Sequence, residues 1–210
     1  MSLYQTEQRQ AKTTRILVYP NITFAKDLEK DSYIQVIKKQ ITLLNEIRDD
    51  LWFYLILPKE VPSLVFDNVT QLIVYLPTHS PTMRAHFDTE AIKKVLPREY
   101  DFDLVMCHLP EHAYDLKNVL YNKTQHMPKF FGYAHWFDFK EVVNWPMDSF
   151  NKSMIGLLEY DRCYINTQHQ KEMVLKQAEE IFNSDTLYKL SNILEVQHIG
   201  VDSKDIVSEI

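Results

Sequence analysis

The sequence predicts an α/β protein in which helices cover both faces of a mainly parallel β-sheet. Short apolar runs of strand length alternate along the chain with segments whose apolar residues recur at three- and four-residue spacing, as in amphipathic helices. The connections between the apolar runs are long enough to contain a helix, and such crossovers join parallel strands. Together these observations predict a three-layer arrangement of helices, sheet and helices.

The first half of the chain alternates strands with helices. A continuous apolar run closed by Pro20 is typical of a strand that is buried on both faces. Two later runs also stop at a proline, which cannot donate to a sheet ladder. A helix after the first strand is indicated by Ile34, Ile37 and Ile41 at helical spacing. In chain order, the expected elements are strand 15–19, helix 31–49, strand 52–57, strand 71–76 and helix 88–96.

The second half repeats this alternation, with more polar residues after each strand. Thr167 and Gln170 have the spacing of a capping box, in which two side chains satisfy backbone amides at the start of a helix. A long amphipathic helix is therefore expected to begin there, with an apolar side that runs to Phe182. In chain order, the expected elements are strand 103–107, helix 113–121, strand 129–134, helix 150–158, strand 162–165, helix 167–182 and strand 194–198.

Composition and charge argue against several classes of protein. The 210 residues suffice for one domain of ordinary globular composition. A formal net charge of −6 gives no general attraction to nucleic acid or anionic lipid. No apolar stretch has the length of a signal peptide or a transmembrane segment, and Cys107 and Cys163 have no partner at metal-ligand spacing. We therefore expect a cytoplasmic protein with two buried free thiols.

The chain contains three glycines, Gly132, Gly156 and Gly200. A phosphate-binding loop of the P-loop or dinucleotide type needs several glycines close together, because the backbone must approach the pyrophosphate. The three glycines are far apart in the sequence. Neither type of nucleotide-binding loop is therefore expected.

The stretch 108–112 reads His-Leu-Pro-Glu-His, which matches the inverted H-x-x-E-H motif of zinc proteases. That motif needs both histidines on one face of a continuous helix. Pro110 would stand inside that helix, where it lacks an amide donor and clashes with the preceding turn. We therefore expect no zinc site, and we interpret His112 as a solvent-facing residue in the first turn of the next helix.

Polar and aromatic residues gather just after the predicted strands. The carboxyl ends of parallel strands meet at one edge of the sheet, where open α/β sheets bind ligands. Loops are polar in any protein, but this explains less well the two histidines that directly follow apolar strands. The residues are Asn21 and Thr23 after the first strand, His108 and Glu111 after the strand at 103–107, and His135 and Trp136 after the strand at 129–134.

His135 has two possible roles. A histidine at the mouth of a sheet can hydrogen-bond a sugar hydroxyl or a phosphate, and the ring of Trp136 can pack against a pyranose. Alternatively, His135 bonds to the backbone and Trp136 packs in the core of a loop. The two residues by themselves leave both interpretations open.

Several stretches together resemble the N-terminal domain of GT-B-fold glycosyltransferases, in particular the retaining, glycogen-synthase-like group 1 type. These stretches are DFDLVMCHLPE, FFGYAHW, LLEYDRCYINTQHQKEMVLKQ and EVQHIGVD, in this order. The most specific parts are 159–167 and the Gly-Val-Asp at 200–202. The implied organisation is an N-terminal extension at 1–14, a Rossmann-like domain at 15–202 and the start of an interdomain linker at 203–210.

The resemblance implies transfer of a sugar from a nucleotide-sugar donor, with this domain binding the acceptor, a sugar or glycoconjugate. His135 matches the family's histidine near the reacting sugar and is the expected catalytic residue, and His108 matches a position that lines the acceptor cleft. The other expected acceptor contacts are Asn21, Thr23, Glu111 and Trp136. The donor pocket is expected in a C-terminal domain, in cis or in trans. The isolated domain is therefore expected to be inactive and to need no metal or cofactor.

Two alternatives belong to other functional classes. A stand-alone Rossmann-like module could bind a sugar or a protein partner without catalysis. A reading frame that continues beyond Ile210, or an adjacent one with a second α/β domain, would favour the enzyme. A response-regulator-like domain is the weaker alternative, because it needs an acidic pocket after the first strand and Tyr19-Pro20-Asn21 offers none.

Overall fold

The structure, a computed structural model, describes residues 13–20, 32–58, 66–74, 87–96, 101–122, 126–134, 137 and 148–198. The strands in these residues are β1 (Thr14–Tyr19), β2 (Leu51–Pro58), β3 (Val69–Val74), β4 (Leu104–Cys107), β5 (Lys129–Ala134), β6 (Arg162–Ile165) and β7 (Leu194–Val196). They form one 7-stranded sheet in the order β3-β2-β1-β4-β5-β6-β7. Every pair of neighbouring strands is parallel.

This strand order is that of a Rossmann-like, doubly wound sheet. From β1 the chain proceeds to β2 and β3 on one side, and from β4 it proceeds to β5, β6 and β7 on the other. The direction of winding therefore reverses between β1 and β4, which pair from Ile16 with Leu104 to Tyr19 with Cys107. Because all pairs are parallel, the carboxyl ends of the strands lie at one edge of the sheet.

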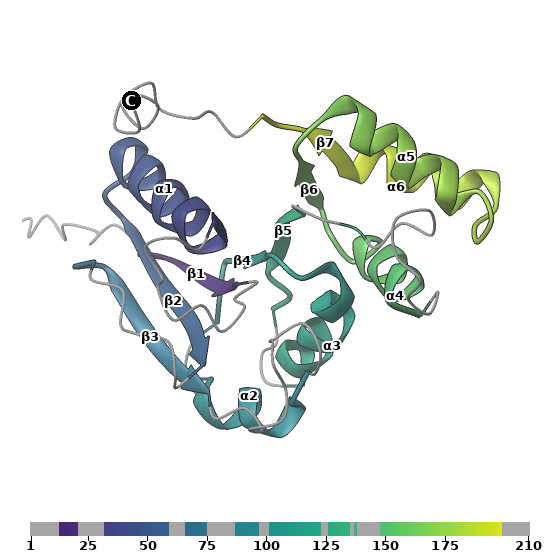
Figure 1. Ribbon diagram of the computed structural model, residues 1–210. Helices are drawn as coiled ribbons and strands as arrows, with labels where there is room; N and C mark the ends of the chain where they lie inside the picture. Colours follow the sequence, from purple (N-terminus) through teal and green to yellow (C-terminus); the bar gives the residue numbers. More distant parts are fainter. Residues whose placement is uncertain are drawn as a thin grey trace, which may run out of the picture.

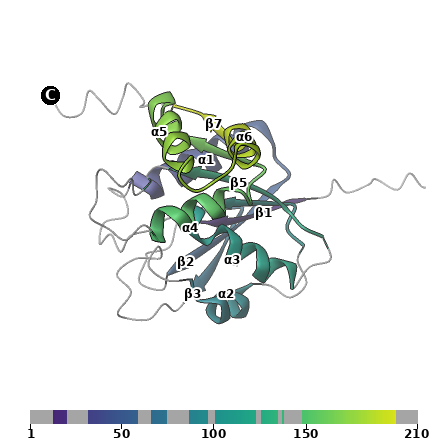
Figure 2. The same ribbon diagram turned by 90° about the vertical axis from the view of Figure 1, so that its right-hand side faces the viewer.

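Helices cover both faces of the sheet (Figure 1). They are α1 (Ser32–Ile47), α2 (Thr89–Val95), α3 (Pro110–Tyr121), α4 (Asp148–Leu157), α5 (Gln168–Ala178) and α6 (Ser184–Ile193). α1 lies on one face beside β1 and β2, whereas α3, α4, α5 and α6 lie on the opposite face, which Figure 2 turns toward the viewer. The predicted α/β class, with a parallel sheet between two helical layers, is confirmed.

The central strands are buried on both faces, which explains their continuous apolar sequence. Leu17 and Val18 of β1 are completely buried. The apolar side of α1, formed by Ile34, Ile37 and Ile41, is at most 1% exposed and belongs to the same core. Burial of each such side chain stabilises the fold by about 2 kcal/mol. The spacing that predicted a helix therefore also identified the face that packs on the sheet.

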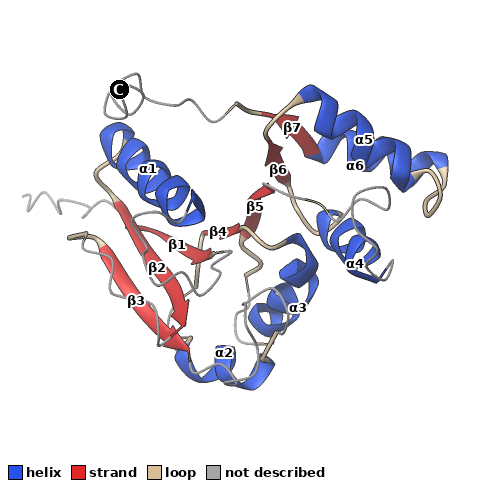
Figure 3. Ribbon diagram, viewed as in Figure 1, coloured by secondary structure: helices blue, strands red, loops and turns tan. Residues whose placement is uncertain are grey.

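The helix predicted at 167–182 is present but shorter than predicted, because α5 ends at Ala178, and a separate helix that was not predicted, α6, follows it (Figure 3). The predicted start is present: the Thr167 hydroxyl accepts the Gln170 N–H at 3.0 Å. α5 ends at Ala178, and α6 begins after Asn183, whose side-chain oxygen accepts the Thr186 N–H at 3.0 Å. Asn183 is thus the N-cap of α6, whereas α5 has already ended at Ala178.

Candidate functional site

The candidate site lies where the strand order reverses, at the carboxyl ends of β1 and β4. Open α/β sheets bind ligands at such switch points, outside the carboxyl ends of the strands. Tyr19 ends β1 and pairs with Cys107, which ends β4. The next residue, His108, and the first turn of α3 follow directly.

His108 is held tightly against the end of β1. Its side chain is 2% exposed. Its backbone N–H donates to the carbonyl oxygen of Tyr19 at 2.9 Å and so extends the β1–β4 ladder. The Cys107 thiol donates to the carbonyl oxygen of Leu109 at 3.3 Å. These bonds fix the short segment between β4 and α3.

α3 begins earlier than predicted, at Pro110 and not at Ala113. Proline is favoured at the first helical position because its missing N–H would have no helical partner there. Glu111 follows in the first turn, where the helix dipole favours a negative charge. Two of the predicted acceptor contacts, His108 and Glu111, therefore lie close together at the end of β4.

The prediction that His112 faces solvent is wrong. Its side chain is 5% exposed, and its Nδ1 atom lies 3.0 Å from the hydroxyl oxygen of Tyr19. The first turn of α3 packs over the end of β1, so His112 faces Tyr19. His108 precedes the helix while His112 lies within it, so the two histidines do not share a helix face as an H-x-x-E-H zinc site requires.

Three rings pack together beside this hydrogen bond, and we call them the switch-point triad: Tyr19 of β1, Phe87 just before α2, and His112 of α3. The ring centroids are 5.9 Å apart for Tyr19 and Phe87, 5.8 Å for Tyr19 and His112, and 5.5 Å for Phe87 and His112. Both contacts of His112 are edge-on, an arrangement that the charge distribution of aromatic rings favours. The triad joins β1 to the starts of α2 and α3.

Burial raises the pKa of Tyr19 well above its ordinary value, and the negative charges of Glu111 and Asp115 raise it further. The hydroxyl therefore stays protonated at neutral pH and remains available to His112. Burial also raises the pKa of the Cys107 thiol to about 12, so it stays uncharged and is a poor nucleophile. The charge of Glu111 contributes to the rise of both pKa values.

Two glycines allow other elements to approach the backbone of the site. A Cβ atom on Gly132 of β5 would lie 2.3 Å from Tyr160 Cε1 and 2.5 Å from the Cys107 carbonyl oxygen. A Cβ atom on Gly156 of α4 would lie 1.7 Å from the Pro110 carbonyl oxygen. Tyr160 also donates its hydroxyl to the Cys107 carbonyl oxygen at 3.0 Å. The backbone on both sides of His108 is therefore fixed by close packing.

The stretch 159–161, which belongs to the resemblance described above, contacts α3 and β5. Glu159 forms an ion pair with Lys117 of α3 at 2.9 Å. The Lys117 Nζ atom also lies 5.6 Å from the ring centroid of Phe130. The Asp161 carboxylate accepts the Phe130 N–H at 2.8 Å. These contacts hold α3 in place behind the candidate site.

Four of the predicted site residues, Asn21, Thr23, His135 and Trp136, lie outside the described residues. The structure does describe the strands that lead to them, β1 and β5. Together with β4, which leads to His108 and Glu111, these strands are consecutive in the order β1-β4-β5. In the sequence, the predicted residues therefore follow three strands that are neighbours in the sheet.

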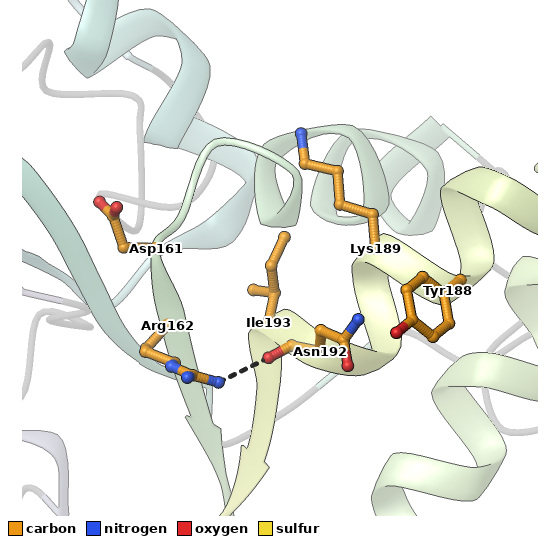
Figure 4. A pocket seen from close by; sticks show the side chains of 6 residues that line it. All are labelled: Asp161, Arg162, Tyr188, Lys189, Asn192 and Ile193. Atoms are coloured by element: carbon orange, nitrogen blue, oxygen red, sulfur yellow. Dashed lines mark hydrogen bonds between the residues drawn. The ribbon is translucent and has the colours of Figure 1, made fainter.

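A depression of about 380 Å³ lies elsewhere, between the start of β6 and the end of α6 (Figure 4). Its lining residues are Asp161, Arg162, Tyr188, Lys189, Asn192 and Ile193. The Arg162 guanidinium donates to the Asn192 carbonyl oxygen at 2.8 Å and so satisfies the last turn of α6. The depression lies at the amino end of β6, opposite to the edge where α/β sheets bind ligands. We therefore assign the candidate site to the β1–β4 switch point.

The described residues contain no group of three or more His, Cys, Asp or Glu side chains that could hold a metal ion. Within the same ranges, no helix is long and apolar enough to cross a membrane. The side chains described at the switch point are the imidazoles of His108 and His112, the carboxylate of Glu111, the phenol of Tyr19 and the phenyl ring of Phe87.

Comparison with models of known protein families finds none that matches the chain. Comparison with curated proteins finds no significant match. We therefore infer a function from the residues at the switch point and from the sequence stretches described above.

Proposed function

We propose that this chain is the acceptor-binding domain of a glycosyltransferase. A sugar or glycoconjugate acceptor binds at the carboxyl edge of the sheet, between β1 and β4, and a C-terminal domain, in cis or in trans, binds the nucleotide-sugar donor. The observation that supports the proposal most is the position of His108 and Glu111 together at the switch point of a doubly wound sheet. His135, Trp136, Asn21 and Thr23 complete the proposed site.

The side chains at the switch point suit hydroxyl groups. The carboxylate of Glu111 is partly exposed and can accept hydrogen bonds from sugar hydroxyls. The imidazole of His108 can donate and accept such bonds, but it is 2% exposed and meets an acceptor only at the small part of its surface that reaches the edge of the sheet. Aromatic rings such as that of Trp136 bind the apolar face of a pyranose. In the proposed reaction the domain positions the acceptor hydroxyl for attack on the donor sugar, and His135 acts near the reacting atoms.

The same site is poorly suited to a phosphate. Glu111 and Asp115 place negative charge near the end of β1. Lys117, the basic residue of α3, is paired with Glu159. At the amino end of α3, Pro110 has no N–H and the His112 N–H donates to the Leu109 carbonyl oxygen at 3.0 Å, so two of the first three helical positions provide no N–H for an anion. These features favour a hydroxyl-bearing acceptor here and a donor diphosphate bound elsewhere.

The proposed location is the cytoplasm. Both cysteines, Cys107 and Cys163, are buried free thiols. Such thiols are typical of proteins in a reducing compartment.

Saturation-transfer NMR of the 210-residue chain tests this function. The probes are methyl glycosides of glucose, galactose, mannose and N-acetylglucosamine, together with UDP-glucose and GDP-mannose. The expected result is binding of a glycoside that Glu111→Gln and His135→Ala abolish. Glu172→Gln, an exposed carboxylate on α5, is the matched control and should bind as the wild type does.

Three results would contradict the proposal. Tight binding of a nucleotide sugar by this chain, or no binding of any glycoside, would favour the stand-alone module. Sugar transfer by the isolated chain would also contradict the expected need for a second domain.

A further inference from the structure

The hydrogen bond between Tyr19 and His112 joins two residues 93 positions apart in the sequence, at the centre of the candidate site. Tyr19 ends β1, and His112 lies in the first turn of α3. Both side chains are almost completely buried. The hydroxyl oxygen and the Nδ1 atom are 3.0 Å apart, a normal length for a hydrogen bond.

Tyr19 contacts the chain on both sides of the proposed acceptor contacts. Its backbone carbonyl oxygen accepts the His108 N–H at 2.9 Å. Its hydroxyl reaches His112 four residues later in the chain, at the 3.0 Å given above. His108 and Glu111 therefore lie in a short segment that one residue holds at both ends.

We propose that Tyr19 and His112 are positioning residues of the acceptor site, which set where His108 and Glu111 stand at the edge of the sheet. The inference rests on the function proposed above. Neither residue of the pair needs to contact the acceptor, because each acts through the segment between them.

A purely structural role would not require a polar pair here. Replacing both partners of a buried hydrogen bond by apolar groups of the same shape is often nearly neutral for stability. An apolar contact, however, tolerates sliding and rotation of a helix, whereas a hydrogen bond weakens steeply when its length or angle changes. Ligand contacts need their side chains held within about 0.5 Å of the productive position. The Tyr19–His112 hydrogen bond therefore limits sliding and rotation of the first turn of α3.

The ring of Phe87 covers the hydrogen bond between Tyr19 and His112. It packs against both Tyr19 and His112, with centroid distances of 5.9 and 5.5 Å. A hydrogen bond covered in this way competes less with water than an exposed one. The segment that enters α2 is thereby also fixed relative to the pair.

Four variants separate positioning from folding. Tyr19→Phe and His112→Leu each remove one polar partner and leave the other buried. His112→Asn keeps a polar group near the position of Nδ1 and can still meet the Tyr19 hydroxyl. The double variant Tyr19→Phe/His112→Leu removes both partners and should recover most of the stability that either single change loses.

The measurement is an NMR titration of each folded variant with the methyl glycoside that the wild type binds, alongside urea unfolding. We expect Kd to rise about tenfold in Tyr19→Phe, in His112→Leu and in the double variant, and to stay within about threefold of the wild type in His112→Asn. The amide resonances of His108 and Glu111 should shift in the first three variants and return toward wild-type positions in His112→Asn.

Two outcomes would overturn the inference. Wild-type Kd values in Tyr19→Phe and His112→Leu, or in the double variant once its stability has recovered, would show that the pair only supports folding. Failure of the wild type to bind any glycoside would overturn the proposed function and the inference with it. The two failures are distinguishable, because the first leaves sugar binding intact.

Discussion

Replacing Gly156 with alanine is expected to destabilise the protein, although alanine is the better helix former. In an isolated helix the change would be favourable by about 1 kcal/mol. Here the added Cβ atom would lie 1.7 Å from the Pro110 carbonyl oxygen. Carbon and oxygen atoms ordinarily stay at least about 3.3 Å apart, so α4 would have to move from α3 by about 1.6 Å, the difference between the two distances.

The size of this destabilisation depends on whether the atoms around the new Cβ can move away from it. Overpacking in a close-packed interior costs about 1–3 kcal/mol. The obstructing atom belongs to the backbone at the start of α3, so no change of side-chain rotamer relieves the clash. We therefore take the upper value, about 3 kcal/mol, and subtract the helix gain, which leaves about 2 kcal/mol of net destabilisation. For a chain of this size the expected fall in Tm is about 6 °C.

Urea and thermal unfolding monitored by circular dichroism measure this change. Lys152→Ala is the matched control, because Lys152 is exposed in the same helix, and its stability should stay within about 0.5 kcal/mol of the wild type. If Gly156→Ala proves equal to or more stable than the wild type, helix propensity dominates. The close approach of α4 to Pro110, and the fixed backbone inferred from it, would then be wrong.

Three further predictions concern other parts of the structure. Cys107, whose pKa burial raises to about 12, should not react with a thiol reagent in the native protein at pH 8 and should react fully in urea. Asn183→Ala should cost about 1 kcal/mol in urea unfolding, because the side-chain oxygen that caps α6 is lost. A hydrogen bond from Arg48 holds the pKa of Asp50 below its usual value. The interaction of the ionised Asp50 carboxylate with Arg48 therefore stabilises the fold above the unfolded pKa of about 4, and this contribution is lost as the pH falls through the lower pKa of the folded state. Unfolding of Asp50→Asn over a pH series should show a flatter dependence in that acidic range, and an unchanged profile would contradict the assigned interaction.

The fold class could be predicted because apolar periodicity reports which faces are buried. The predicted strands 129–134 and 162–165 coincide with β5 and β6. The first run lies between Pro128 and His135 and the second between Asp161 and Asn166, so the local sequence indicates where each strand begins and ends. The order of the strands could not be read in this way, because pairing between β1 and β4 joins residues that no local pattern connects.

The candidate site was predictable only in part, for the same physical reason. His108 could be singled out because it directly follows an apolar strand. The environment of His112 depends on Tyr19, 93 residues away, and nothing in the helical pattern of α3 reports that partner. The end of α5 at Ala178 was missed because apolar residues continue at helical spacing to Phe182, and α6, whose cap at Asn183 is a weaker signal than such spacing, was not predicted.

Two of the three glycines in this chain, Gly132 and Gly156, lie at close contacts beside the candidate site. The first lies against the carbonyl of Cys107 and the second against the carbonyl of Pro110, so both serve the backbone that flanks His108. In nucleotide-binding sheets, glycines at the switch point let the backbone approach a pyrophosphate. Here they let β5, Tyr160 and α4 approach the backbone of the site itself. The result is a closely packed segment in which the His108 and His112 N–H groups are already bonded to backbone carbonyls, which suits precise hydrogen bonding to a hydroxyl-bearing acceptor better than binding of a phosphate.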